Sequence, residues 1–186
     1  LVNEGRATVA QLNALLGGLA EIVMESFGTL DKFTGDGLMA FWGAPLDQPD
    51  HADRACRAAI GMQQLLERRH HELDLPSDDT EFRIGIGIAS GQVVVGNVGH
   101  EQRLDYTAIG DTVNLAARLE QSTKELEIRT AVSHDTWLRL SEPLRARCRE
   151  AATINVRGRS TSTQVHRLDH LLAAVDDAPV STGIVS

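Results

Sequence analysis

Aromatic residues are scarce in this sequence, and cysteines are scarcer. Phe, Tyr and Trp make up 4% of the 186 residues, and we expect Tyr106 and Trp137 to be packing residues, not a platform on which nucleotide bases stack. The two cysteines, Cys56 and Cys148, lie far apart, and neither has metal-ligand spacing around it. Both are therefore expected to be reduced thiols of a cytosolic protein.

A long apolar run and an excess of positive charge are also absent. The best apolar stretch, FRIGIGIASGQVVVG, is interrupted by glycines and an arginine, so it does not predict a membrane span. The net charge of −8 excludes a general surface for nucleic acid or anionic membrane, since both need a cationic footprint, but it permits a small nucleotide site. We predict a cytoplasmic domain without membrane contact of its own, even where the parent protein is membrane-attached.

What remains is the composition of an ordinary globular domain. Hydrophobic residues make up 42% of the chain and charged residues 24%, which is enough apolar material for a real core. The chain begins at Leu1 without a signal-peptide pattern, so we expect a fragment of something longer. Residues 1–169 are predicted to form one domain, and residues 170–186 a C-terminal tail or linker.

Several segments have the apolar spacing of helices. They are residues 8–27 with Gly28 just past the end, residues 51–73 with Asp50 as N-cap, residues 111–123 with Asp111 or Thr112 as the cap, and a short helix at 134–141. An acidic loop, DLPSDDTE, is predicted to follow the second of them.

Short apolar runs between these helices predict strands. Leu30–Phe33 and Leu38–Trp42, joined by TGDG, predict a tight hairpin. Residues 82–90 and 92–99 predict a second hairpin that turns near Ser90-Gly91, and further strands are expected at 103–109, 127–133 and, as a terminal pair, 148–168. This irregular order favours an α+β fold, with helices on one face of the sheet, over a doubly wound parallel sheet.

Asn114 and Arg118 are the first candidate pair for chemistry. They are four residues apart, so on a helix they project from the same face. An amide beside a guanidinium suits a ribose hydroxyl and a phosphate. The alternative is an ordinary polar face on which Arg118 pairs with Glu120 or Glu125, and spacing alone favours that alternative.

Asp36, between Gly35 and Gly37, is the second candidate. A carboxylate on a hairpin turn can coordinate a hard cation such as Mg²⁺ beside a phosphate. The alternative is a turn aspartate that hydrogen-bonds its own backbone, which composition alone favours. Lys32 lies four residues before it, either as the other half of a solvated pair or as a ligand-binding residue.

Three sequence blocks that occur in one order favour the functional interpretations of these residues over the alternatives. They are GTLDKFTGDGLMAFWGAP, RIGIGIASGQVVVGNVG and RLDYTAIGDTVNLAARLE. Together they closely resemble the catalytic domain of class III nucleotidyl cyclases, the adenylyl and guanylyl cyclases. The resemblance extends from about Val9 to about Leu168 and includes the closing INVRGRSTSTQVHRL. It implies a ferredoxin-like, antiparallel-rich sheet with covering helices.

Carried over position by position, the resemblance also implies a set of site residues. They are Asp36 as the second of two metal-binding aspartates, Lys32 and Thr107 as the purine-reading pair, Asn114 as the ribose-orienting amide, Arg118 as the arginine that stabilises the transition state, and Arg157 or Arg159 as the basic residue at the triphosphate. The implied cofactors are two Mg²⁺ or Mn²⁺ ions per site.

The purine-reading pair favours ATP as substrate. Lys32 can donate to a ring nitrogen of adenine, and Thr107 can accept from its exocyclic amine. Guanylyl cyclases of the family carry glutamate and cysteine at these two positions. The Lys/Thr combination resembles the subgroup stimulated by bicarbonate, which makes bicarbonate a candidate regulator.

One part of the family pattern is missing. The first metal-binding aspartate of these cyclases lies in a Phe-x-Asp-Ile-x-Gly-Phe-Thr strand before the first helix, whereas only Glu4 is acidic in this part of the chain. We expect that strand to precede Leu1 in the parent protein. The alternative is a non-catalytic nucleotide-binding or regulatory module.

The resemblance further implies a homodimer with shared sites. In this family the metal aspartates of one site come from one chain, and the purine, ribose and arginine groups come from the other. Lys32 and Asp36 would then serve opposite sites of a symmetric dimer. An enzyme that uses GTP is the remaining rival, and Lys32 opposes it.

Overall fold

The computed structural model describes residues 2–72, 83–100, 103–155 and 162–170. The helices are α1 Val2–Glu25, α2 His51–Glu72, α3 Asp111–Glu125, α4 His134–Trp137 and α5 Glu142–Arg145. The strands are β1 Thr29–Thr34, β2 Gly37–Phe41, β3 Ile86–Ile88, β4 Val94–His100, β5 Arg103–Ile109, β6 Thr130–Ser133, β7 Cys148–Asn155 and β8 Ser162–Leu168. The expected loop at 74–81 and residues 171–186 of the expected tail lie outside the described residues. No helix in the described part is long and apolar enough to span a membrane.

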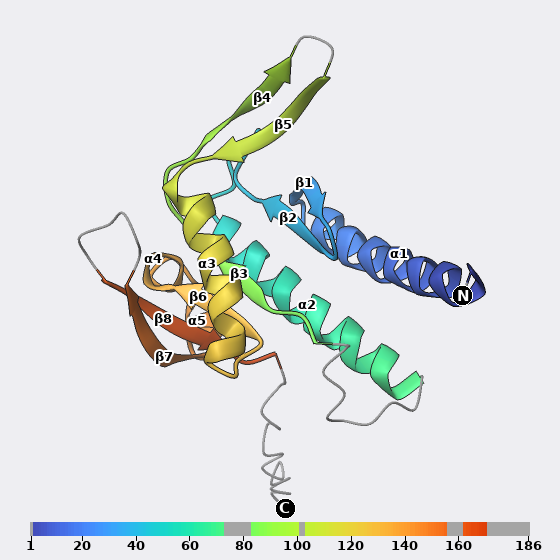
Figure 1. Ribbon diagram of the computed structural model, residues 1–186. Helices are drawn as coiled ribbons and strands as arrows, with labels where there is room; N and C mark the ends of the chain where they lie inside the picture. The colour runs from blue at the N-terminus through green and yellow to red at the C-terminus, as the bar shows by residue number, and fades with distance from the viewer. Residues whose placement is uncertain (1, 73–82, 101–102, 156–161, 171–186) are drawn as a thin grey trace, which may run out of the picture.

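The strands form one larger sheet and two separate hairpins (Figure 1). The larger sheet has the order β3-β6-β8-β7, in which β3 and β6 are parallel and the other neighbours are antiparallel. The hairpin β1–β2 lies beside α1, and the hairpin β4–β5 extends away from the rest of the molecule. The prediction of a mixed α+β fold with antiparallel-rich sheets is confirmed.

Helices cover both faces of the larger sheet, so the prediction of helices on one face is wrong. On one face, Leu115 and Leu119 of α3 pack against the sheet. On the other face, α2, α4 and α5 surround a second cluster that includes Cys56 and Val132. All four residues of β6 are buried, because this strand has a helix on either side. The sequence of β6, TAVS, does not alternate between polar and apolar residues, so it does not indicate a strand with one solvent-exposed face.

The second predicted hairpin is also wrong. β3 pairs with β6, and β4 pairs with β5 from Val94↔Ile109 to His100↔Arg103. The glycine of β3, Gly87, allows close packing against α3. A side chain at Gly87 would overlap the backbone of Ala116 and Glu120 in α3. The turn residues between β3 and β4 indicated that these two consecutive strands pair. In the structure β3 instead pairs with β6, some forty residues further along the chain.

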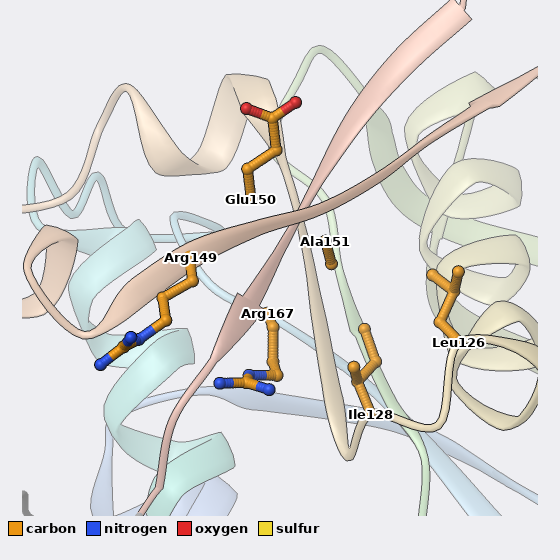
Figure 2. Close-up of a pocket in the computed structure, with 6 residues that line it drawn as sticks. All are labelled: Leu126, Ile128, Arg149, Glu150, Ala151 and Arg167. Atoms are coloured by element: carbon orange, nitrogen blue, oxygen red, sulfur yellow. The ribbon is translucent and has the colours of Figure 1, made fainter.

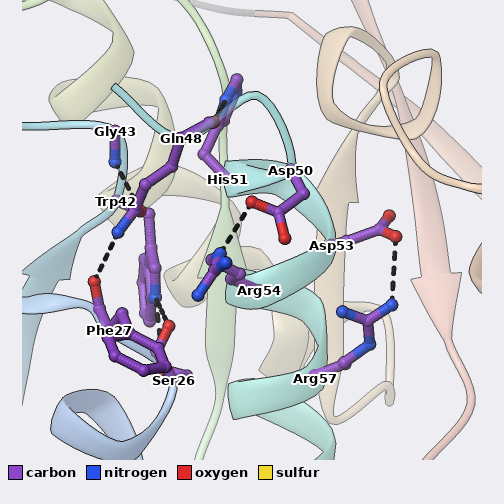
Figure 3. A network of polar contacts seen from close by, with 10 residues as sticks. All are labelled: Ser26, Phe27, Trp42, Gly43, Gln48, Asp50, His51, Asp53, Arg54 and Arg57. Atoms are coloured by element: carbon purple, nitrogen blue, oxygen red, sulfur yellow. Dashed lines mark hydrogen bonds and ion pairs between the residues drawn. The ribbon is translucent and has the colours of Figure 1, made fainter. Parts of the chain in front are cut away.

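Helix α1 ends differently from the prediction. Phe27, not Gly28, adopts the left-handed conformation, with φ 59°. The amides of Phe27 and Gly28 donate to the carbonyls of Met24 and Val23, as in a Schellman motif. Gly28 is required for another reason, since a Cβ there would lie 2.6 Å from the ring of Trp42. Trp42 thereby packs against the helix end and donates from Nε1 to Ser26 (Figure 3).

The loop between β2 and α2 is held by a network of polar contacts (Figure 3). Gln48 accepts from the amide of Gly43 and donates to the carbonyl of Phe27, so it ties this loop to the end of α1. Asp50 precedes α2 as predicted, although its carboxylate binds Arg54 at 2.7 Å. At the start of α3 the cap is Gly110, not Asp111 or Thr112.

Candidate active site

Lys32 lies in β1 beside an irregularity of the hairpin. The register slips between Leu30 and Lys32, so Asp31 has no partner in β2. Such a β-bulge interrupts the alternation of side chains and re-aims them. The side chains of Asp31 and Lys32, consecutive in sequence, therefore approach each other, with Lys32 Nζ 3.4 Å from Asp31 Oδ1. The side chain of Lys32 is 45% exposed, whereas that of Asp31 is 0% exposed.

Thr107 is connected to Lys32 through the same aspartate. Its hydroxyl donates to Asp31 Oδ2 over 2.6 Å, and the amide of Ala108 donates to that oxygen over 3.3 Å. These bonds attach β1 to β5, and the rings of Phe41 and Tyr106 meet at 6.1 Å beside them. The structure thus brings the two predicted purine-reading residues to one place.

Asp36 is exposed at the turn between β1 and β2. Gly35 before it has φ 69°, while the φ of Asp36 itself is not positive. No backbone amide in the described chain donates a hydrogen bond to the Asp36 carboxylate. The alternative of a self-bonded turn aspartate is therefore not observed, and the carboxylate is available to solvent.

Asn114 and Arg118 project from α3, which follows directly after β5. Asn114 is exposed and Arg118 half-buried. Buried Leu115 and Leu119 fix the neighbouring side of the helix to the sheet. No ion pair joins Arg118 to Glu120 or Glu125 in the described structure, so the alternative of a paired surface arginine is not observed either.

The remaining predicted groups are not assembled in the described chain. Arg157 and Arg159 lie outside the described residues. No group of three or more His, Cys, Asp or Glu side chains that could hold a metal occurs within residues 2–72, 83–100, 103–155 and 162–170. No side-chain bond in these ranges links Asp36, Asn114 or Arg118 to the Lys32–Thr107 pair.

Asp31 is the residue that the sequence interpretation missed. An acidic residue inside an apolar strand, next to Lys32, was the available signal. Strict alternation would have placed it on the face opposite Lys32. Only the bulge brings its carboxylate to the lysine side.

One pocket, of about 380 Å³, lies elsewhere on the molecule (Figure 2). Leu126, Ile128, Ala151, Glu150 and two arginines line it, and none of the predicted site residues does. The arginines, Arg149 and Arg167, both bind the carboxylate of Asp169, at 3.3 and 2.9 Å. These contacts hold the end of β8 against β7, which is a structural role.

The thiols offer no nucleophile. Cys56 and Cys148 are both free, and burial raises the pKa of both, that of Cys148 to about 11. Catalysis through a thiolate is therefore not supported.

Comparison with known proteins shows the family of the chain. The family model described as "Adenylate and Guanylate cyclase catalytic domain" matches residues 2–169. The chain belongs to this family. Among its relatives, Adenylate cyclase 1 of Rhizobium meliloti (strain 1021) is 34% identical over 97% of the chain. The adenylate cyclase of Anabaena cylindrica is 36% identical over 71% of it. The chain spans 27% and 26% of the length of these two proteins.

Solved cyclase structures have the same fold. The adenylyl cyclase CyaB from P. aeruginosa is 30% identical, with a TM-score of 0.75 over 88% of this chain and 83% of that one. The guanylyl cyclase Cya2 is 28% identical, with a TM-score of 0.73 over 90% and 83%. Similar proteins thus include both adenylyl and guanylyl cyclases, and the choice of base has to be argued from this cyclase domain's own residues.

Proposed function

We propose that this cyclase domain converts ATP to cyclic AMP and pyrophosphate. The observation that carries the proposal is the junction of β1 and β5, where Lys32 and Thr107 meet around Asp31. A lysine ammonium only donates hydrogen bonds, and a threonine hydroxyl can accept one. That combination suits the edge of adenine, which accepts at its ring nitrogen and donates from its amine.

The reaction is an intramolecular phosphoryl transfer. The 3′-hydroxyl of ATP attacks the α-phosphorus, the new O–P bond closes the ring, and the bond to pyrophosphate breaks. Asn114 orients the ribose, and Arg118, one turn further along α3, stabilises the negative charge that develops on the phosphate. Losing such a donor costs on the order of 10²–10³ in kcat. Arg157 is proposed to hold the triphosphate.

Asp36 is the carboxylate of this chain that would hold a divalent ion. Its exposure at a turn and its lack of a protein partner among the described residues suit such a ligand. Bound Mg²⁺ or Mn²⁺, two ions per site, would make the 3′-hydroxyl a better nucleophile and offset phosphate charge. One carboxylate is half of a two-aspartate set, and we propose that the other lies outside the described residues.

Two unpaired strand edges support the proposal of a further strand that bears the second aspartate. β2 and β3 each have one edge without a strand partner in the described structure. Both strands contribute to one apolar cluster, around Leu19, Val23 and Met62, through Leu38 and Ile86 among others. A strand inserted between them would satisfy both edges.

We further propose that the active form is a homodimer with shared sites. Asp36 is not joined to Asn114 or Arg118 within the described chain, which fits groups contributed by different subunits. The projecting hairpin β4–β5 exposes apolar side chains that a second copy would cover: Val94 75%, Val98 44%, Leu104 54% and Ile109 51%. Bicarbonate remains a candidate regulator of this dimer.

The test is nucleotide turnover by the parent catalytic domain, in a form that includes the strand expected before Leu1. Cyclic AMP should form from ATP with Mg²⁺ or Mn²⁺, and the double variant Lys32→Glu with Thr107→Cys should shift the ratio of kcat/KM from ATP towards GTP. No cyclic AMP with either metal would overturn the proposed reaction. An unchanged ATP/GTP ratio would show that these two residues do not read the base.

A further inference from the structure

Asp31 is a buried carboxylate that the reaction described above does not use. Its side chain is 0% exposed, and its Oδ1 has no hydrogen-bond partner among the described residues; Lys32 Nζ lies 3.4 Å from this oxygen. Burying an ionised carboxylate with half of its hydrogen-bonding capacity unused is costly. A valine or threonine would suit a strand at this position better. The presence of an aspartate therefore calls for a role beyond packing.

The contacts of Asp31 determine which way the hydroxyl of Thr107 points. An ionised carboxylate only accepts, so the single hydrogen of Thr107 is directed to Asp31 Oδ2. The distance of 2.6 Å is that of a charge-assisted O–H···O⁻ bond. The amide of Ala108 donates to the same oxygen and holds it in place. With its hydrogen engaged, the hydroxyl can offer a ligand only lone pairs.

We propose that Asp31 is a specificity-determining positioning residue, which fixes Thr107 as a hydrogen-bond acceptor beside Lys32 as a donor. This inference rests on the proposed function, in which Lys32 and Thr107 read the purine. Adenine presents an acceptor at N1 and a donor at its 6-amine, which complements the pair. Guanine and hypoxanthine present a donor at N1 and an acceptor at O6, so both positions oppose them.

Without the carboxylate, this discrimination weakens. The amide of an asparagine at position 31 can accept from the Thr107 hydroxyl or donate to it. In the second case the hydroxyl hydrogen is free to turn towards a 6-oxo group. Asp31 itself need not touch the nucleotide, because it acts through Thr107.

The experiment compares ATP with inosine triphosphate, which differs at N1 and at the 6-position, in the parent catalytic domain that includes the strand expected before Leu1. Asp31→Asn should lower the ATP/ITP ratio of kcat/KM by about tenfold, the scale of one hydrogen bond. In a Thr107→Val background the same substitution should leave the ratio unchanged, because the group through which Asp31 acts is gone. Additive effects of the two substitutions on the ratio would overturn the inference.

Asp53→Asn is the matched control. Asp53 is also a buried aspartate, bonded to the amide of Ser141 and to Arg57, on the far side of α2 from β1. Its substitution should lower thermal stability and leave the ATP/ITP ratio at the wild-type value. A drop in the ratio as large as that of Asp31→Asn would mean that general loosening, not the orientation of Thr107, sets base choice. If Asp31→Asn does not fold, Thr107→Val alone should lower the ratio, and an unchanged ratio overturns the inference.

Binding of 3′-deoxy-ATP and 3′-deoxy-ITP, which cannot cyclise, separates the two proposals. Tighter binding of the adenine nucleotide by the wild type, lost in Asp31→Asn, supports the inference even if no cyclic product forms; the absence of product overturns only the proposed reaction. Equal binding of both nucleotides by the wild type overturns the inference. Binding of neither overturns both.

Discussion

Gly87→Ala should destabilise the domain and lower its rate of ATP turnover. Gly87 lies in the middle of β3, and its φ is not positive, so alanine suits its backbone. The obstacle is α3: an added Cβ would overlap the carbonyl of Ala116 and the amide of Glu120, and would lie 3.0 Å from the Glu120 Cα. These are backbone atoms that cannot rotate away, so the helix has to move as a body.

The size of the effect follows from this overlap. Overpacking of this kind costs about 1–3 kcal/mol, and the loss of glycine freedom in the unfolded chain returns about 0.4–1 kcal/mol. The net loss of about 1–2 kcal/mol corresponds to a fall in Tm of roughly 2–8 °C for a domain of this size. Arg118 lies between the two contacted residues of α3, so it moves with them. A displacement near ~1 Å lowers kcat on the order of 10²-fold.

Urea unfolding followed by tryptophan fluorescence and turnover of ATP are the two measurements. Gly17→Ala is the control, because Gly17 is exposed in α1 and an added Cβ meets nothing within 4 Å. That substitution should raise stability by about 0.5–1 kcal/mol and leave turnover unchanged. The reasoning is refuted if Gly87→Ala unfolds at the wild-type urea concentration and retains wild-type kcat.

Two further predictions concern the dimer and the pH dependence of stability. Asp36→Ala and Arg118→Ala should each be nearly inactive. A mixture that exchanges chains freely should regain roughly a quarter of wild-type activity, because half of the dimers are mixed and half of the sites in those are intact. If native mass spectrometry confirms heterodimers and the activity does not exceed the sum of the separate variants, shared sites are ruled out. Burial, followed by the neighbouring His134, lowers the pKa of His166, which Glu150 partly opposes. Because the unfolded chain then takes up the proton first, the free energy of unfolding should decrease as the pH falls below about 6.5. His166→Gln should reduce this dependence of the unfolding free energy on pH, and His51→Gln should leave it unchanged. An equal pH dependence in the wild type and in His166→Gln would contradict the assignment.

Much of the architecture could be predicted because local sequence patterns indicate the individual helices and turns. The apolar spacing of α1, α2 and α3 predicted three helices, and the glycines around Asp36 predicted the hairpin β1–β2. The blocks around Lys32, Asp36, Asn114 and Arg118 also indicated the family, which the comparisons confirm. The roles of these residues in catalysis remain predictions.

Other features depend on what packs against what. Ser90 and Gly91 predicted the turn of a hairpin, but β3 pairs with β6, and α3 approaches Gly85 and Gly87 so closely that neither has room for a side chain. The positive φ at the end of α1 lies at Phe27, and Gly28 leaves room for the ring of Trp42. Neither detail follows from the apolar spacing of the helix.

The sequence by itself determined the kinds of chemical group available: a lysine, a threonine, an amide, a guanidinium and a turn carboxylate in a family-specific order. The tertiary structure alone decided that Asp31 stands between Lys32 and Thr107. Pairing of strands far apart in the chain cannot be read from local periodicity, because each strand's pattern shows which face is buried but not which partner buries it. A one-residue bulge then reverses the side on which a carboxylate lies, and the role in base choice proposed for Asp31 depends on that reversal.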